Sequence, residues 1–224
     1  MTNGNRRLDE VFSSQSKYCY PNTDVLINKL NIQNQEDLDR AERSLTLLRL
    51  TNLQMYGIPN YSFEFTVDYY LAIHQFLFQD LYDFAGKIRS ENITKGSTPF
   101  CRPEFIYNYL DSLLKEMYQK VKFIKTKEDL LHFLAYYYAE INVVHPFREG
   151  NGRVLREFLR QSVKHINKIQ DLHLEIDYSL TDDQATEDLM NGSIASAMMG
   201  NIDLLKSFFN KVTIEKELEK ERKR

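Results

Sequence analysis

The stretch His145-Pro146-Phe147-Arg148-Glu149-Gly150-Asn151-Gly152-Arg153-Val154-Leu155-Arg156 decides both the fold and the function that this sequence predicts. Pro146 disfavours the α-region for the residue before it and lacks a backbone donor. We therefore expect the preceding helix to end near Val143, with His145 at the mouth of a loop. The two glycines can adopt positive φ and allow a ligand to approach the main chain closely. The stretch therefore predicts a loop that accommodates a ligand.

An apolar helical pattern follows this loop directly. Its positions recur at three- and four-residue spacing, at Val154, Leu155, Phe158, Leu159, Ser162 and Val163. The first free N–H groups of such a helix point back at the loop and attract anions, above all phosphate. Arg153 and Arg156 lie three positions apart on one face of the first turns, where two guanidinium groups can grip a polyphosphate. Because positive side chains oppose the helix dipole there, a purely structural cap would favour the opposite charge.

The remaining polar residues add chemistry to that anion site. Glu149 is a carboxylate suited to a divalent cation that also touches phosphates. His145 titrates near neutral pH and can take a proton from an incoming hydroxyl. Together the residues predict a nucleotidyl or phosphoryl transfer site with a base, a metal carboxylate, an anion cradle and an arginine clamp.

The stretch matches every fixed position of the Fic family motif, H-x-F-x-[D/E]-G-N-G-R-x-x-R, so the sequence resembles that family. The resemblance implies an all-α Fic fold, a bundle of about seven to eight helices with a β-hairpin flap over the active site. It also implies a protein adenylyltransferase, which moves AMP from Mg-ATP to a Tyr, Thr or Ser hydroxyl of a target protein, or of itself, and releases pyrophosphate. The implied roles are the base for His145, a buried loop anchor for Phe147, the Mg²⁺ ligand for Glu149, the anion hole for Gly150, Asn151 and Gly152, the β/γ-phosphate ligand for Arg153 and the closing of the clamp for Arg156.

Other activities are weighed against this one. The related Doc-type kinases depart from the motif at its glycine and asparagine positions, and the phosphocholine-transferring members replace its first glycine. Since Gly150 and Arg153 are both present, neither variant is indicated. Transfer of UMP remains an alternative, because the motif recognises the phosphates and not the nucleobase. A non-catalytic module that senses ATP is a further alternative, against which His145 argues because sensing needs no base.

Composition narrows the class of protein. The chain has 224 residues, of which 42% are hydrophobic, enough for one large helical domain with a real core. Its net charge of −3 argues against nucleic acid as the main partner. Cys19 and Cys101 have neither metal nor redox spacing, which favours a reducing compartment. With no recognisable signal peptide or membrane span, the sequence predicts a cytoplasmic protein without a membrane partner.

Periodicity and capping residues predict the other elements. Residues 1–33 read as an irregular arm, 34–212 as the Fic domain and 213–224 as a charged tail that is either a helical extension or a frayed end. Helices are expected over 36–55, from Thr66 to just before Gly86, from Pro103 to 121, from Thr126 to the motif, from Thr181 to Gly200, and over 203–212. Expected inward positions include Leu48 and Met55 in the first helix and Tyr109 in the third.

The interval from Lys87 to Phe100 lacks helical periodicity and contains the turn-rich run Lys95-Gly96-Ser97-Thr98-Pro99. In Fic proteins the flap occupies this position, and it aligns the target by strand addition. The resemblance therefore places Lys95 and Gly96 near the ligand and assigns Phe100 to clamp the target or nucleotide. It also places the helix from Thr181 beside the adenosine pocket, with Asn191 and Met198 as candidates.

Self-inhibition is where the sequence departs from the family. Many Fic proteins carry an inhibitory helix with [S/T]-x-x-x-E-[G/N]. Here only Ser112 with Glu116 and Thr213 with Glu217 have the Glu spacing, and neither Glu is followed by Gly or Asn. We therefore expect no usual self-inhibitory helix. A separate antitoxin-like inhibitor or homo-oligomerisation would then restrain activity.

Overall fold

Two consecutive helices and the loop between them form the centre of the molecule. The computed structural model describes residues 15–95, 98–181, 189, 192, 193, 196 and 200–215. Helix α4 (Lys127–Val144) begins with the predicted capping box, in which the Thr126 side chain accepts from the Asp129 N–H and the Asp129 carboxylate accepts from the Thr126 N–H. Helix α5 (Asn151–Gln170) follows after a six-residue loop and packs against α4.

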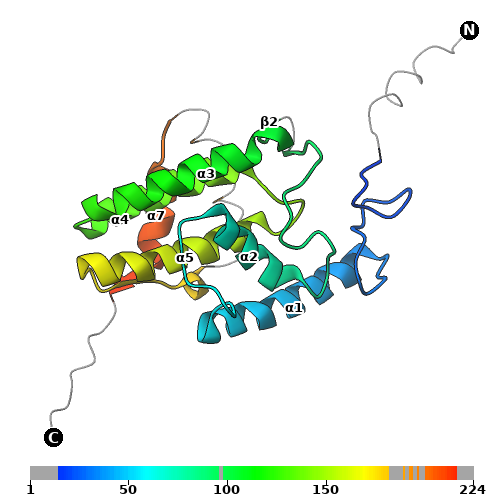
Figure 1. Ribbon diagram of the computed structural model, residues 1–224, viewed down its shortest axis with the longest axis horizontal. Coiled ribbons are helices and arrows are strands. Elements are labelled where there is room, and N and C mark those ends of the chain that lie inside the picture. The colour runs from blue at the N-terminus through cyan, green and yellow to red at the C-terminus, as the bar shows by residue number, and fades with distance from the viewer. Residues whose placement is uncertain are drawn as a thin grey trace, which may run out of the picture.

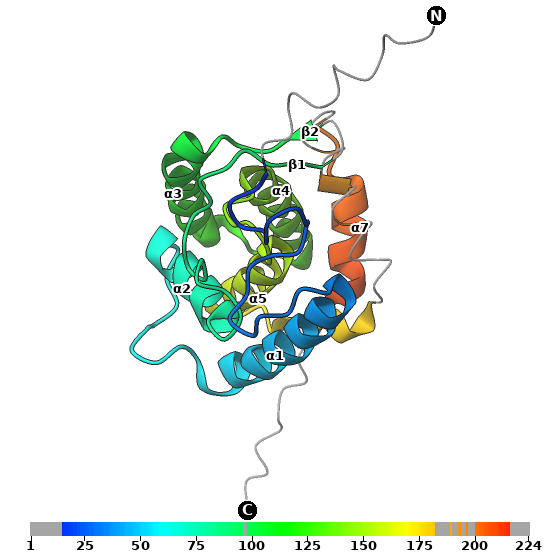
Figure 2. The same cartoon turned by 90° about the vertical axis from the view of Figure 1, so that its right-hand side faces the viewer.

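Among the described residues, four further α-helices surround this pair. They are α1 (Gln35–Tyr56), α2 (Val67–Phe78), α3 (Pro103–Lys120) and α7 (Asp203–Val212). Figure 2 shows α1 along one side of α5, α2 and α3 on a second side, and α7 beside α4 on a third. Short 3₁₀ turns, η1 (Val121–Phe123) and η2 (Tyr178–Leu180), follow α3 and β3 respectively. The architecture is mostly helical, as the motif implied, with α5 in the middle (Figure 1).

Two small antiparallel sheets complete the fold. Strand β1 (Thr94–Lys95) pairs with β2 (Thr98–Pro99), where the sequence predicted the flap hairpin. Strand β3 (Leu174–Ile176) pairs with β4 (Thr213–Glu215), with Glu175 opposite Ile214. The prediction of a helical or frayed tail from residue 213 is therefore wrong for residues 213–215. Thr213 is buried and continues directly from α7 into the strand, because β3 offers it a backbone partner.

The helical stripes differ in places from those predicted. In α1 the buried side chains are Leu38, Thr46 and Leu53, whereas Leu48 and Met55 are 58% and 64% exposed. The prediction failed because Thr46, whose hydroxyl donates to the Glu42 carbonyl, occupies an inward position that hydrophobicity does not mark. In α3 Tyr109 lies at the surface, and its hydroxyl donates to Glu140.

Helix α2 is shorter than predicted. Its N-cap is Thr66, as expected, but it ends at Phe78 instead of continuing to Gly86. Leu81 and Tyr82 both donate backbone hydrogen bonds to the Phe78 carbonyl, which turns the chain while keeping both side chains buried. The apolar pattern of the sequence therefore continues beyond Phe78, where the helix ends. Among the described residues, no helix is long and apolar enough to cross a membrane.

Candidate active site

His145 ends helix α4 in an uncommon backbone conformation. It is the C-cap, with φ 46° and ψ 63°, and so lies in the left-handed region, outside the right-handed α-region that the following proline disfavours. Its Nδ1 lies 3.1 Å from the carbonyl oxygen of Asn142, which favours a proton on Nδ1 and leaves Nε2 as the basic nitrogen. The imidazole is half-buried. Helix α4 thus presents a histidine at the loop, as the sequence predicted.

A stack of aromatic rings anchors the loop between α4 and α5. Phe147 is fully buried, and the ring of His74 lies parallel to it at 3.8 Å. His74 accepts from the Gly86 N–H at Nδ1, so its Nε2 carries the proton and donates to the Glu149 carbonyl at 3.1 Å. Burial lowers the pKa of His74 to about 3. A neutral histidine therefore holds the loop from α2.

Asn151 closes the loop with its side chain. Its Oδ1 accepts from the Phe147 N–H and its Nδ2 donates to the Phe147 carbonyl, both at 2.8 Å. The side chain is buried and committed to these two bonds. The main-chain N–H of Asn151 lies in the first turn of α5, where it is suited to contact an anion.

Gly150 is required by packing as well as by conformation. It is the N-cap of α5 with φ 83°, and a Cβ there would lie 2.2 Å from Cζ of Phe78. The first helical hydrogen bond of α5 runs from Val154 N–H to the Gly150 carbonyl. The N–H groups of residues 151–153 precede that bond, so the start of α5 has the free amides of an anion cradle.

Arg153 and Arg156 both line clefts beside α1. One cleft of about 460 Å³ lies against α1, and one of about 980 Å³ extends toward β3 and η2. Arg153 is ion-paired with Glu42 and Glu149, the latter at 3.2 Å, and its guanidinium lies 4.8 Å from the centre of the Phe78 ring. Arg156 is hydrogen-bonded to Tyr138. The two arginines thus face a space large enough for a polyphosphate.

Glu149 stands at the same end of α5. Its Oε1 accepts from the Gly150 N–H at 2.7 Å and from Arg153, and its side chain is 41% exposed. A single accessible carboxylate next to a phosphate cradle fits Mg²⁺, which proteins often hold with one or two carboxylates and substrate phosphates. No group of three or more metal-binding side chains occurs in the described part of the chain.

The flap residues are only partly described. Lys95 lies at the end of β1, while Gly96 lies outside the described residues, as do Asn191 and Met198 of the predicted adenosine pocket. Phe100 follows β2, and its ring stacks on the imidazole of His145 with centroids 3.9 Å apart. The residue expected to act as a clamp therefore touches the proposed base directly.

A buried arginine ties the flap to the catalytic loop. Arg89 is 2% exposed and donates to the carbonyls of His145 at 2.8 Å, Glu91 at 2.6 Å and Val144 at 3.4 Å, and also to that of Cys101. Burial lowers the pKa of this guanidinium, and no acidic side chain pairs with it among the described residues. Its partners lie on both sides of the β1–β2 hairpin and at the end of α4.

Sequence reasoning missed Arg89, His74, Glu42 and Thr46. Each acts through a contact with a segment far away in the chain, and none belongs to a spaced motif. A hint existed only for His74, because a histidine on an otherwise apolar helix face is expected to be buried with its nitrogens satisfied.

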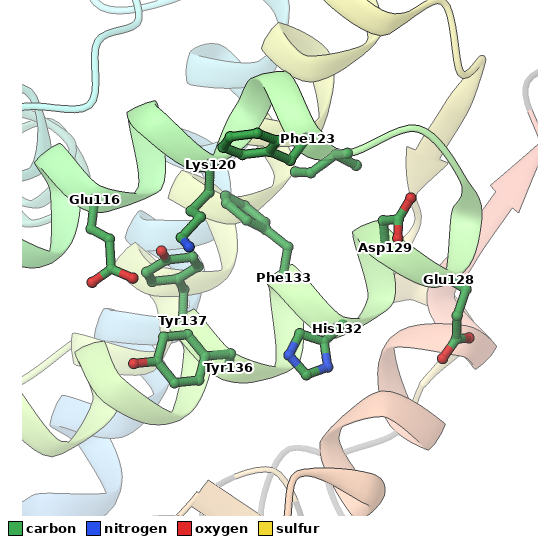
Figure 3. Close-up of a pocket in the computed structure, with 10 residues that line it drawn as sticks. Glu116, Lys120, Phe123, Glu128, Asp129, His132, Phe133, Tyr136 and Tyr137 are labelled. Atoms are coloured by element: carbon green, nitrogen blue, oxygen red, sulfur yellow. The ribbon is translucent and has the colours of Figure 1, made fainter.

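A separate hollow of about 520 Å³ lies between α3, η1 and the start of α4 (Figure 3). Its lining combines aromatic and charged side chains, and Glu116 is hydrogen-bonded to Tyr137 within it. None of the motif residues lines this hollow, so it is not the active site. Glu116, one of the two glutamates with inhibitory spacing, therefore lies in a different place from the arginine clefts.

Comparisons with known proteins agree with this geometry. The family model described as "Fic/DOC family" matches residues 64–162. The chain is 30% identical over 212 residues to a protein of Escherichia coli (strain K12) named "Probable protein adenylyltransferase Fic", covering 92% of this chain and 96% of that protein. The chain belongs to the Fic/DOC family.

Further relatives and solved structures are similar to the chain. Protein adenylyltransferase VbhT of Bartonella schoenbuchensis is 30% identical over 200 residues, which cover 88% of this chain and 39% of VbhT. The structure of the type IV secretion system effector protein BepA is similar with a TM-score of 0.72 and 26% identity, covering 88% of this chain and 68% of that one. The BepC structure from Bartonella tribocorum, with bound AMPPNP, has a TM-score of 0.71 at 22% identity and covers 89% and 97% of the two chains.

Proposed function

We propose that this protein is a protein adenylyltransferase that moves AMP from ATP to a hydroxyl of a target protein. The observation that carries the proposal is the junction of α4 and α5. There His145, held by its Nδ1, ends one helix, while free amides, Glu149 and two arginines begin the next. The names of the relatives and the nucleotide bound to BepC support the same activity.

The proposed reaction is an in-line displacement at the α-phosphorus of ATP. The target hydroxyl passes its proton to Nε2 of His145, and its oxygen forms a bond to the α-phosphorus. The bond from this phosphorus to the bridging oxygen of the β-phosphate breaks, and pyrophosphate leaves with that electron pair. The nearby amides of residues 151–153 and the two arginines stabilise the charge that develops on the phosphates.

Glu149 is the residue proposed to hold Mg²⁺. The ion supplies charge neutralisation of the phosphate oxygens when it is bound. Glu149 is suited to this role because its carboxylate is accessible and lies next to Arg153 and the amide of Gly150.

The flap is proposed to align the target. Strand β1 pairs with only two residues of β2, and its backbone lies close to Phe100, which contacts His145. An extended target segment can add to such a hairpin by main-chain hydrogen bonds, with Lys95 and Gly96 near the ligand.

We place the protein in the cytoplasm.

Restraint of the activity is proposed to come from outside the chain. Ser112 lies inside α3, where its hydroxyl donates to the Asn108 carbonyl, and Thr213 opens strand β4 instead of a helix. Glu217 lies outside the described residues. A separate antitoxin-like protein or self-association would then supply the restraint. Activity that rises by orders of magnitude in Glu217→Gly would contradict this proposal.

Mass spectrometry of the products tests the nucleotide and the activity together. The protein is incubated with candidate targets and labelled ATP, UTP or GTP. The masses of its own chain and of the targets are then measured. AMP added to a Tyr, Thr or Ser supports the proposal, whereas added UMP identifies a different nucleotidyltransferase. Nucleotide binding without any transfer would instead indicate an ATP-responsive binding module.

Replacement of the proposed base gives a sharper test. His145→Ala is expected to lower AMP transfer at least about 100-fold while ATP affinity changes little, because general base catalysis contributes roughly 10²–10⁴-fold. Transfer is measured with labelled ATP and affinity by calorimetry. His132→Ala, an exposed histidine on the same helix, serves as the control. Normal AMP transfer by His145→Ala would refute the assigned role.

A further inference from the structure

Glu42 of α1 makes contacts that the motif does not account for. Its Oε1 is ion-paired with Nη2 of Arg153, and its Oε2 accepts a hydrogen bond from the Tyr82 hydroxyl. The carboxylate side chain is only 14% exposed. Thr46, one helical turn further along α1, accepts from Nη1 of Arg153 at 3.2 Å. One face of α1 thus carries two acceptors for the same guanidinium.

The carboxylate is anchored in the core through Tyr82. This tyrosine is 1% exposed, and its ring stacks on Phe84 at 4.6 Å. Burial, with the Glu42 carboxylate second, raises the pKa of Tyr82, so the hydroxyl stays protonated and donates. Both oxygens of Glu42 therefore have built-in partners, and the side chain cannot swing without breaking a buried hydrogen bond.

The same contacts define the orientation of Arg153. Its guanidinium lies over the Phe78 ring and donates to Glu42, Thr46 and Glu149. A guanidinium has five N–H groups. These three contacts use three of them, which leaves two for an anion in the adjacent cleft that Glu42, Arg153 and Arg156 line together.

We infer that Glu42 is a positioning residue for the phosphate-binding arginine. Glu42 holds the Arg153 guanidinium at the cleft. The guanidinium therefore keeps its position when Glu149 leaves Arg153 and binds another partner. Tyr82 and Thr46 complete this support. The inference rests on the proposed function, because it takes Arg153 to bind the phosphates of ATP. The opposite reading is that Glu42 competes with phosphate for Arg153, and the two readings predict opposite changes in affinity.

A double-mutant cycle on ATP affinity separates these readings. Dissociation constants are measured by calorimetry for the intact protein, Glu42→Gln, Arg153→Ala and the double variant. Glu42→Gln is expected to weaken ATP binding about tenfold alone and less than twofold in the Arg153→Ala background, because it acts through Arg153. Glu36→Gln, an exposed glutamate on the same helix, is the matched control and should change nothing.

Several results would overturn the inference. They are tighter ATP binding in Glu42→Gln, unchanged binding, and the same factor in both backgrounds. If Glu42→Gln melts at a much lower temperature, Tyr82→Phe replaces it in the cycle, since it removes only the hydroxyl that fixes Glu42. In that case we expect a smaller loss of ATP affinity, again only when Arg153 is present.

Failure of the proposed function is recognised separately. If the intact protein binds ATP but transfers no AMP, that function fails while the cycle still reports on Glu42. If the intact protein binds neither ATP nor inorganic pyrophosphate, both proposals fall.

Discussion

The first glycine of the motif has two separate reasons to be glycine. It needs a positive φ to begin α5, and the Phe78 ring occupies the space where a side chain would start. The sequence indicated the conformational reason and attributed the close approach to a ligand. The structure adds a protein side chain as the neighbour, and no sequence pattern could have placed it there.

Gly150→Ala is therefore expected to destabilise the fold by about 2–5 kcal/mol, since a left-handed residue costs roughly 1–2 kcal/mol and overpacking about 1–3 kcal/mol. Urea denaturation measures the change. Gly200→Ala is the matched control, because Gly200 also has positive φ but a methyl group added there would meet no atom within 4 Å. Only about 1–2 kcal/mol is expected there. Equal losses at both positions would show that contact with Phe78 does not matter.

A second residue-scale effect concerns pH. His74 has a pKa of about 3 in the folded protein and about 6.5 in the unfolded chain. Below pH 6.5 the unfolded chain therefore binds the extra proton, so stability falls as the pH drops from 6.5 toward 3 and gains nothing further above 6.5. The free energy of unfolding is expected to lose a few kcal/mol over this range, on the order of 1.4 kcal/mol per pH unit.

Measuring urea unfolding at several pH values tests this expectation. His74→Asn should be less stable at pH 7 but should show a shallower fall toward pH 4. His132→Gln, which replaces an exposed histidine, should keep the slope of the unmodified protein. An unchanged slope in His74→Asn would mean that other groups cause the pH dependence.

At the scale of elements, local signals and long-range contacts contribute differently. Caps and periodicity placed α1, α4 and α7 to within about a residue or two, because Thr126 and Asp129 form a local capping box and the Asn201 side chain accepts from the Asp203 N–H at the start of α7. They could not place β4, since Thr213–Glu215 becomes a strand only by pairing with β3, 37 or more residues earlier in the chain. They also could not foresee Arg89, whose partners come from three segments.

Arg89 therefore provides a test of how the flap and the loop are joined. Arg89→Met leaves four carbonyls without their donor, and each buried unpaired group costs about 1–3 kcal/mol. We expect a loss of at least about 3 kcal/mol in urea denaturation and a large fall in AMP transfer.

Arg89→Lys, which keeps the charge and up to three donors, should recover part of the stability. Arg102→Met is the control, because that arginine is exposed and its contacts with Glu104 and the Phe105 ring lie at the surface. Normal stability and activity in Arg89→Met would show that the flap and the loop hold their positions independently.

At the scale of the whole molecule, the family resemblance predicted the mostly helical Fic fold correctly. The twelve-residue motif carried that prediction because the residues proposed to bind phosphates also form the junction of the two central helices. The arrangement of α1 was beyond the sequence. Its predicted inward positions Leu48 and Met55 lie exposed, while its polar Glu42 and Thr46 turn inward to Arg153.

The stability of the whole chain should respond to nucleotide. At a concentration 100-fold above its dissociation constant, Mg-ATP is expected to stabilise the protein by about 2.7 kcal/mol. For a chain of this size the melting temperature should then rise by roughly 5–10 °C. Calorimetric melting with and without Mg-ATP measures the shift. The double variant Arg153→Ala/Arg156→Ala should lose most of it, and a full shift in that variant would exclude the two arginines as the nucleotide contacts.

The ring of Phe100 rests flat on the imidazole of His145. One broad side of the base is therefore shielded, and an acceptor group must enter from the rim and pass beside a phenyl ring. A target residue at the tip of a flexible segment can reach His145 in this way, whereas a target residue that lies flat on a rigid surface cannot. Selection among acceptors would then depend on how far the neighbouring polypeptide lets a side chain protrude, more than on which of the three alcohols it carries.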